Sequence, residues 1–168
     1  MKKIGLFYSK NAANTTAVAK QIQQAFGNTA VDLIPVEEAW QKDFEDCDCI
    51  IAGTATWFDG ELPSAWDEMI PILNTLKLQG KKVAIFGLGD QINYPDNFVD
   101  GIGLLARAFE SAGATLTGST ATDGYRFGQS LALKADRFDG LVIDVDNQAD
   151  ETEKRIQNWV DSLKIAFQ

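Results

Sequence analysis

The sequence has no histidine and only two cysteines, which leaves little with which to bind a metal. Cys47 and Cys49, without a histidine anywhere in the chain, make a poor metal site. They lie two residues apart at the entrance to an expected strand, so we expect them to point to the same face, and a disulfide between them would be strained. The sequence therefore predicts two reduced thiols that pack inside a cytoplasmic protein.

Long hydrophobic runs are also missing. No window approaches the roughly 20 apolar residues that are needed to span a bilayer. Met1-Lys2-Lys3 leads directly into a short expected strand, without the apolar segment of a signal peptide. We therefore expect neither a membrane anchor nor an export signal.

Basic residues are scarce as well. The chain has 15 Lys and Arg against 24 Asp and Glu, a net charge of −9. Because nucleic-acid binding depends on basic patches that neutralise phosphates, no nucleic-acid partner is expected. The acidic excess suits a protein that is steered towards basic partners, although acidity also serves solubility alone.

Short apolar runs alternate with amphipathic segments along all 168 residues, and no repeat, linker or low-complexity tract divides them, which predicts one domain. Strands are expected at 4–8, 31–34, 49–52, 81–86 and 114–116, and helices at 14–26, 64–76, 97–112 and 150–167. A polar stretch at 118–137 interrupts the last strand, whose character resumes at 141–145. This βαβ alternation predicts an α/β protein with a parallel sheet covered by helices on both faces.

Ligands of such sheets bind beyond the carboxyl ends of the strands, which here are followed by the loops 9–16, 54–62 and 87–97. The first loop joins a strand to a helix N-terminus, where free N–H groups and the helix dipole favour a phosphate. Its Ser, Asn and Thr residues would equally suit a helix N-cap. The loop contains no glycine, so it is neither a dinucleotide fingerprint nor a P-loop.

The other two loops carry aromatic residues. Gly87 and Gly89 follow an apolar strand and would let the backbone approach a flat ligand, with Tyr94 lying over the face of that ligand. Trp57 follows the preceding strand, in a position where an aromatic more often serves packing than binding. Two aromatics from adjacent loops nevertheless favour a site in which a planar ring lies between them.

Five ordered motifs then resemble a known family. They are residues 4–8, Thr56-Trp57 with Gly60-Glu61-Leu62, residues 86–94 continuing to Asn97-Phe98, Thr122-Asp123-Gly124-Tyr125, and Asp144 with Asp146-Asn147-Gln148. From residue 3 to about 167 the chain resembles a flavodoxin of the long-chain type, and 118–137 resembles the insertion that separates long-chain from short-chain members. The resemblance implies a flavodoxin-like doubly wound sheet of five parallel strands in the order 2-1-3-4-5, with its last strand interrupted.

The resemblance also implies a non-covalently bound FMN. Trp57 and Tyr94 would stack on the two faces of its ring, and backbone groups of Leu88, Gly89 and Asp90 would meet the pyrimidine edge near Asn97. Phe58, Asp59 and Gly60 would lie by N5, where a peptide flip accompanies reduction in this family, and Asp146 would lie towards the ribityl chain. The phosphate would be held by Thr56 and by Ser9, Lys10, Asn11, Ala12, Ala13, Asn14 and Thr15.

The first loop departs from the family pattern, which usually reads Thr/Ser-x-Thr-Gly-x-Thr. Lys10 and Ala12 replace two hydroxyl donors and Ala13 replaces the glycine. Two lost hydrogen bonds to a charged group would weaken FMN binding by roughly tens to thousands of fold. We hypothesise that Lys10 reaches the phosphate as a compensating cation. Asn93 replaces a glycine before Tyr94, and asparagine tolerates a positive φ.

The function that this resemblance implies is low-potential electron transfer, one electron at a time, between a basic-faced reductase and acceptor enzymes, without turnover of a substrate. Glu61, Asp67, Asp96 and Asp100 are the candidate docking acids, and use of an exposed flavin edge for docking favours a monomer. One alternative is an FMN-dependent NAD(P)H:quinone or nitro reductase. Another is a flavodoxin-like module with weakened FMN binding.

Overall fold

A parallel sheet forms the centre of the computed structural model, which describes residues 2–168. Its strands are β1 (Ile4–Tyr8), β2 (Val31–Pro35), β3 (Cys49–Ala55), β4 (Lys82–Leu88), β5 (Thr115–Thr117) and β9 (Leu141–Ile143). The hydrogen-bonded order is β2-β1-β3-β4-β5, with β9 also paired to β4. All of these pairs are parallel, so the expected order 2-1-3-4-5 is confirmed.

The fifth position of the sheet is shared by two strands. β5 pairs with Lys82–Ala84 of β4, and β9 pairs with Phe86–Leu88 further along the same strand. The residues between them form a small antiparallel sheet, β6-β8-β7, from β6 (Thr120–Ala121), β7 (Leu133–Lys134) and β8 (Arg137–Phe138). The predicted interruption is confirmed, but its sheet was missed, because two-residue strands leave no period in the sequence.

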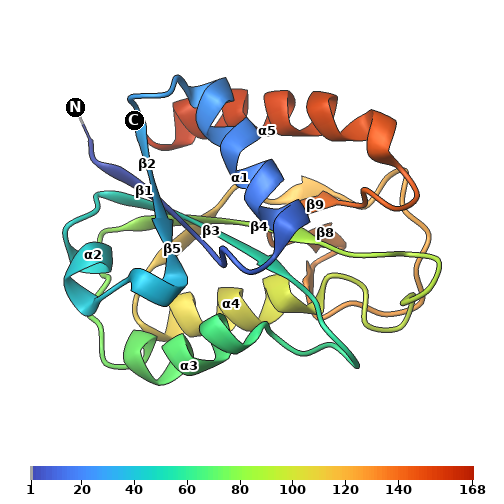
Figure 1. Ribbon diagram of the computed structural model, residues 1–168, viewed down its shortest axis with the longest axis horizontal. Helices are drawn as coiled ribbons and strands as arrows, with labels where there is room; N and C mark the ends of the chain where they lie inside the picture. Colours follow the sequence, from blue (N-terminus) through green and yellow to red (C-terminus); the bar gives the residue numbers. More distant parts are fainter. Residues whose placement is uncertain (1) are drawn as a thin grey trace.

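Helices cover both faces of the sheet (Figure 1). α1 (Ala13–Phe26) and α5 (Thr152–Ala166) pack on one face, and α3 (Ser64–Leu73) and α4 (Asp100–Ser111) pack on the other. The short α2 (Gln41–Glu45) and two 3₁₀ turns, η1 (Val36–Glu38) and η2 (Ala149–Glu151), complete the elements. α3, α4 and α5 are shorter than expected, and α4 begins only at Asp100 because Val99 has a left-handed backbone (φ 48°).

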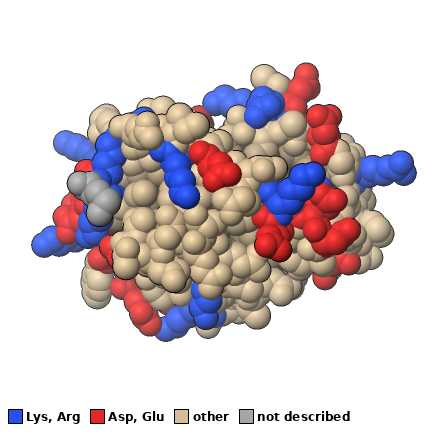
Figure 2. Space-filling view, turned by 90° about the horizontal axis from the view of Figure 1, so that it is seen from above, with Lys and Arg blue, Asp and Glu red and all other residues tan. Residues whose placement is uncertain are grey.

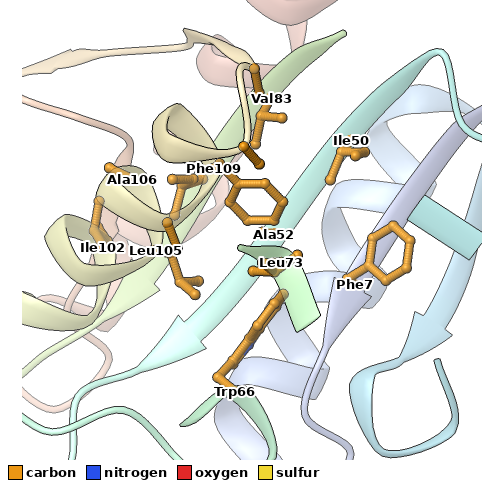
Figure 3. Packing of buried hydrophobic residues seen from close by; sticks show 14 of the residues in the cluster. Phe7, Ile50, Ala52, Trp66, Leu73, Val83, Ile102, Leu105, Ala106 and Phe109 are labelled. Carbon is orange, nitrogen blue, oxygen red and sulfur yellow. The ribbon is translucent and has the colours of Figure 1, made fainter. Parts of the chain in front are cut away.

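The larger core lies between the sheet and the α3–α4 layer (Figure 3). Trp66 of α3 and Phe109 of α4 are fully buried and meet edge to face, with ring centroids 6.3 Å apart. β3 alternates between the two layers, with Ile50 and Ala52 in this cluster and Ile51 in the other. α3 turns Trp66, Met69 and Leu73 into this core, whereas Ile70 is only half-buried.

The two cysteines lie on opposite sides of the sheet, so the expectation of a shared face was wrong. Cys49 is the first residue of β3 and packs in the α1–α5 cluster. Cys47 precedes the strand and packs with Phe7 and Phe44 in the α3–α4 cluster. The two-residue period of a strand does not extend to Cys47, because the backbone there is not yet extended in the sheet. Both thiols are free and buried.

We expect neither thiol to react in the folded protein. Burial raises the pKa of Cys47 to about 11, against the weaker opposing effect of Lys3 and Lys81, and burial also raises the pKa of Cys49. Iodoacetamide at about pH 8 should leave both thiols unmodified in the native protein and alkylate both in urea, since only the thiolate reacts. Mass spectrometry measures this difference, and rapid alkylation of the native protein would contradict it.

Within residues 2–168, none of the helices combines the length and the apolar character that crossing a membrane requires.

Candidate functional site

Four loops meet at the carboxyl edge of the sheet, because β1, β3, β4 and β9 are neighbours there. A cavity of about 370 Å³ opens between them. The predicted site residues that line it are Asn11, Ala12, Ala13, Asn14, Thr15, Thr56, Trp57, Leu88, Gly89, Asp90, Tyr94 and Asp146. Ala55 and Val145 line it as well and were missed, because apolar residues at strand ends carry no signal for binding.

One end of the cavity is the start of α1, which suits an anion. The N-cap residue Ala12 offers no side-chain acceptor to the first N–H groups of the helix, and the first turn holds no acid. Thr15 is 1% exposed, lines the cavity, and its Oγ1 has no hydrogen-bond partner in the described part of the chain. A buried hydroxyl without a partner at an uncapped helix N-terminus fits a bound phosphate group.

Ser9 and Lys10 are not among the residues that line the cavity. The hydroxyl of Ser9 donates to Glu37 Oε1 (2.5 Å). Lys10 Nζ lies 2.6 Å from Glu38 Oε1, and this hydrogen bond and the charge of Glu38 raise the pKa of Lys10. In this structure the ammonium group of Lys10 therefore pairs with an acid on η1 and does not face the cavity, and the hypothesis of a compensating Lys10 cation stays a prediction.

The wall of the cavity also contains the two predicted aromatics. Trp57 follows β3 and Tyr94 follows β4, and both line the cavity. Trp57 is fixed by a tight turn, in which its N–H donates to the Glu61 carbonyl (2.8 Å) and its carbonyl accepts the Glu61 N–H in return (2.7 Å). Tyr94 is 55% exposed, so its ring can change its orientation more freely than that of Trp57.

The tip of the Trp57–Glu61 turn does not line the cavity. It contains the predicted residues Phe58, Asp59 and Gly60, and Phe58 is 75% exposed with a left-handed backbone (φ 47°). Asn97, which also lies outside the lining, donates from Nδ2 to the Asp59 carbonyl (3.2 Å). Phe58, Asp59 and Gly60 therefore form a turn beside the cavity, and Asn97 holds this turn from the side.

Asp90 organises the loop that carries Tyr94. Its Oδ1 accepts the N–H groups of Ile92 (3.1 Å) and Asn93 (3.0 Å), and its carbonyl accepts the N–H of Tyr94 (2.9 Å). Burial works to raise the pKa of Asp90, but hydrogen bonds from Asn93, Asn147 and Ile92 hold that pKa below its ordinary value. The carboxylate is therefore charged at neutral pH.

Gly87 and Gly89 serve packing on the α4 side. A Cβ atom on Gly87 would lie 2.4 Å from Ile102 Cγ1 of α4, and one on Gly89 would lie 2.8 Å from Val99 Cγ1. The Gly89 N–H donates to the Ile143 carbonyl (3.1 Å). The prediction that both glycines give a ligand access to the backbone was therefore wrong for Gly87, which does not line the cavity, while Gly89 does.

Asp144 is a site residue that the sequence reasoning did not single out. It is fully buried, and its Oδ2 accepts the backbone N–H (3.1 Å) and the side-chain Nε2 (2.7 Å) of Gln91. Its Oδ1 accepts the Asn147 N–H (3.0 Å), and Asn147 Nδ2 donates to Asp90 (2.8 Å). Asp144 therefore ties the loop after β4 to the loop after β9. Its only signal in the sequence was its place in a family motif.

Two further predicted residues link elements at the site. The Thr56 hydroxyl accepts the Gly101 N–H (2.9 Å), which joins the end of β3 to the start of α4. Asp100 was expected to be a docking acid, but it is 6% exposed and accepts the Leu131 N–H (2.8 Å). Because a partner protein cannot reach this buried carboxyl group, whose pKa burial also raises, that expectation was wrong. The other docking candidates, Glu61, Asp67 and Asp96, are exposed.

This sheet, with an uncapped helix N-terminus and two aromatics around one cavity, defines a doubly wound α/β protein whose site suits a planar ring that carries a phosphate. A family model described as flavodoxin matches residues 6–159. The chain belongs to the flavodoxin family.

Named relatives cover almost the whole chain. The sequence is 45% identical over 166 residues to a flavodoxin of Nostoc sp., covering 99% of this chain and 98% of the relative. It is 44% identical over 168 residues to that of Synechococcus elongatus, covering 99% of each. A crystal structure of Fusobacterium nucleatum flavodoxin bound to flavin mononucleotide superimposes with a TM-score of 0.95 at 30% identity, over 100% of both chains.

Proposed function

We propose that this protein carries single electrons on a non-covalently bound FMN between a reductase and acceptor enzymes. The observation that carries the proposal is the cavity of about 370 Å³, which is lined by Trp57, Tyr94 and Thr15, whose hydroxyl has no hydrogen-bond partner among the described residues. FMN has the matching shape, a phosphate joined to a planar ring. Membership of the flavodoxin family and the FMN-bound relative support the same ligand.

Each part of the cavity has a distinct task in this proposal. Backbone N–H groups at the start of α1 and the Thr15 hydroxyl bind the phosphate. Trp57 and Tyr94 stack on the ring, Leu88 to Asp90 meet its polar edge, and Asp146 lies by the sugar chain. FMN supplies the redox chemistry, and the protein tunes its potential. The ionised Asp90 places negative charge near the ring, which disfavours added electrons and lowers the potential.

The acidic surface supports docking to a basic redox partner. Figure 2 shows the α1–α5 face, where acidic side chains gather towards the end at which α5 begins and basic ones are frequent near the chain termini. The strands also end on the α5-start side, so the cavity lies towards the acidic end. We propose that the protein works in the cytoplasm, since its two free, buried thiols suit a reducing compartment. We also propose that it is a monomer, since it docks through an exposed flavin edge.

A titration separates the carrier from its alternatives. Apoprotein should quench FMN fluorescence on binding, and stepwise reduction of the complex should then proceed in two separated one-electron steps. The complex alone should not oxidise NADH or NADPH, and it should pass electrons to cytochrome c only when a flavodoxin reductase is added. Oxidation of NADPH by the complex alone would favour the quinone or nitro reductase, and absence of FMN binding would favour the weakened module.

A further inference from the structure

The phosphate end of the cavity rests against a second element, the turn η1. β1 and β2 run parallel and end side by side, with Tyr8 opposite Pro35. The chain that leaves β1 at Ser9 therefore meets the chain that leaves β2 at η1. Val36 is 3% exposed and belongs to the main core, so the start of η1 is anchored. Because the core is close-packed, the next residue, Glu37, has a defined position beside the loop.

Glu37 accepts hydrogen bonds from the donors of this loop that do not face the cavity. The Ser9 hydroxyl donates to Oε1 (2.5 Å), and the Lys10 N–H donates to Oε2 (3.2 Å). Ser9 itself is 2% exposed. The cavity lining begins at the next residue, Asn11, whereas Glu37 lines a separate hollow with Trp40 and Ile72. The carboxylate therefore holds the loop from its outer side.

The charge of Glu37 is stabilised by these contacts. Burial works to raise its pKa, but hydrogen bonds from Ser9 and from the backbone of Glu37, Lys10 and Asn11 together lower that pKa below its ordinary value. The group is thus an ionised acceptor at neutral pH, and hydrogen bonds to a charged acceptor are stronger than those between neutral groups.

We propose that Glu37 is a positioning residue for the phosphate loop: by binding the outer donors of Ser9 and Lys10, it fixes the chain so that the Thr15 hydroxyl and the first N–H groups of α1 face the cavity. The inference rests on the proposed FMN site. It gives a physical reason why a loop with Ala12 and Ala13, which offer no side-chain donors, keeps a binding shape. Glu37 acts through the loop and does not itself touch the phosphate.

Riboflavin provides the discriminating probe, because it has the ring and sugar chain of FMN without the phosphate. Glu37→Ala should raise the Kd for FMN about tenfold and leave the Kd for riboflavin within about twofold. Ser9→Ala should act in the same direction. Both substitutions remove the hydrogen bond between Ser9 and Glu37. The double variant should therefore bind FMN no more weakly than the single variant that binds it more weakly.

Glu38→Ala is the matched control. It removes the same charge one residue further along, and Glu38 contacts the Lys10 side chain rather than Ser9. The ratio of its Kd for FMN to its Kd for riboflavin should equal that of the wild type. Glu37→Gln keeps the size of the side chain and serves as a second variant in case Glu37→Ala does not fold. The midpoint of urea unfolding of each apoprotein shows whether the variant is folded. Weakening of both ligands alike by Glu37→Ala would show a merely structural role.

The opposite sign would also overturn the inference. If Glu37 acts only as a charge, its removal relieves repulsion of the phosphate, and FMN binds more tightly in a way that salt abolishes. Inorganic phosphate tests the loop without any flavin: it should raise the Tm of the wild-type apoprotein and raise that of Glu37→Ala much less. If the wild type responds to phosphate but binds neither flavin, the proposed function fails and the positioning role stands. Equal shifts in both proteins refute that role.

Discussion

Trp57→Ala should weaken FMN binding by about 5- to 150-fold, since stacking of a flat heterocycle on an aromatic side chain contributes about 1–3 kcal/mol. Tyr94→Ala should act in the same direction but less strongly, because Tyr94 is 55% exposed and its removal uncovers less buried surface. Titration of each apoprotein with FMN measures both effects, with the quenching of flavin fluorescence as the signal.

Riboflavin should lose affinity for these two variants by the same factor as FMN, because both ligands share the ring. This shared loss distinguishes the aromatic end from Glu37, whose effect is confined to the phosphate. Trp40→Ala is the matched control, since Trp40 is 77% exposed at the start of α2 and does not line the cavity. If Trp57→Ala and Trp40→Ala bind FMN equally well, Trp57 does not stack on the ring.

The parts of the fold that were predictable are those in which local pattern and burial agree. β1 was placed at its observed bounds, since all but one of its residues are buried and no polar residue interrupts it. The order of the strands came from the resemblance to a family and not from periodicity. α2 and the sheet within the insertion were missed, because a single helical turn and two-residue strands owe their shape to tertiary contacts.

The site was predictable to the level of loops, and less so to the level of side chains. Sequence places Ser9, Lys10 and Thr15 in one loop with similar polarity, yet only Thr15 lines the cavity. The other two are turned outward by Glu37 and Glu38, which lie 27 and 28 residues away from Lys10. No local pattern reports such a pairing. Asp100 was misplaced in the same way, since its partner Leu131 lies in the insertion.

The buried Asp144 carries the second large prediction. Asp144→Ala should lower the free energy of unfolding by about 2–4 kcal/mol, because it removes hydrogen bonds to a charged acceptor and leaves donors of Gln91 and Asn147 without a partner. Asp144→Asn should cost less, since the amide keeps the volume and one acceptor oxygen. Urea unfolding of the apoproteins measures both. Asp150→Asn, at an exposed acid in η2, should change stability by less than about 0.5 kcal/mol.

Asp144→Ala should also weaken flavin binding. Gln91 lies in the loop between Asp90 and Tyr94, and its Oε1 also accepts the Arg126 N–H (2.8 Å), so the anchor at Asp144 holds this loop against the insertion. When the loop loses that anchor, the protein should bind both FMN and riboflavin more weakly, because Tyr94 contacts the ring that the two ligands share. An Asp144→Ala protein as stable as the wild type would show that Gln91 and Asn147 find other acceptors. Unchanged binding of both flavins despite lower stability would show that the loop keeps its shape without the anchor.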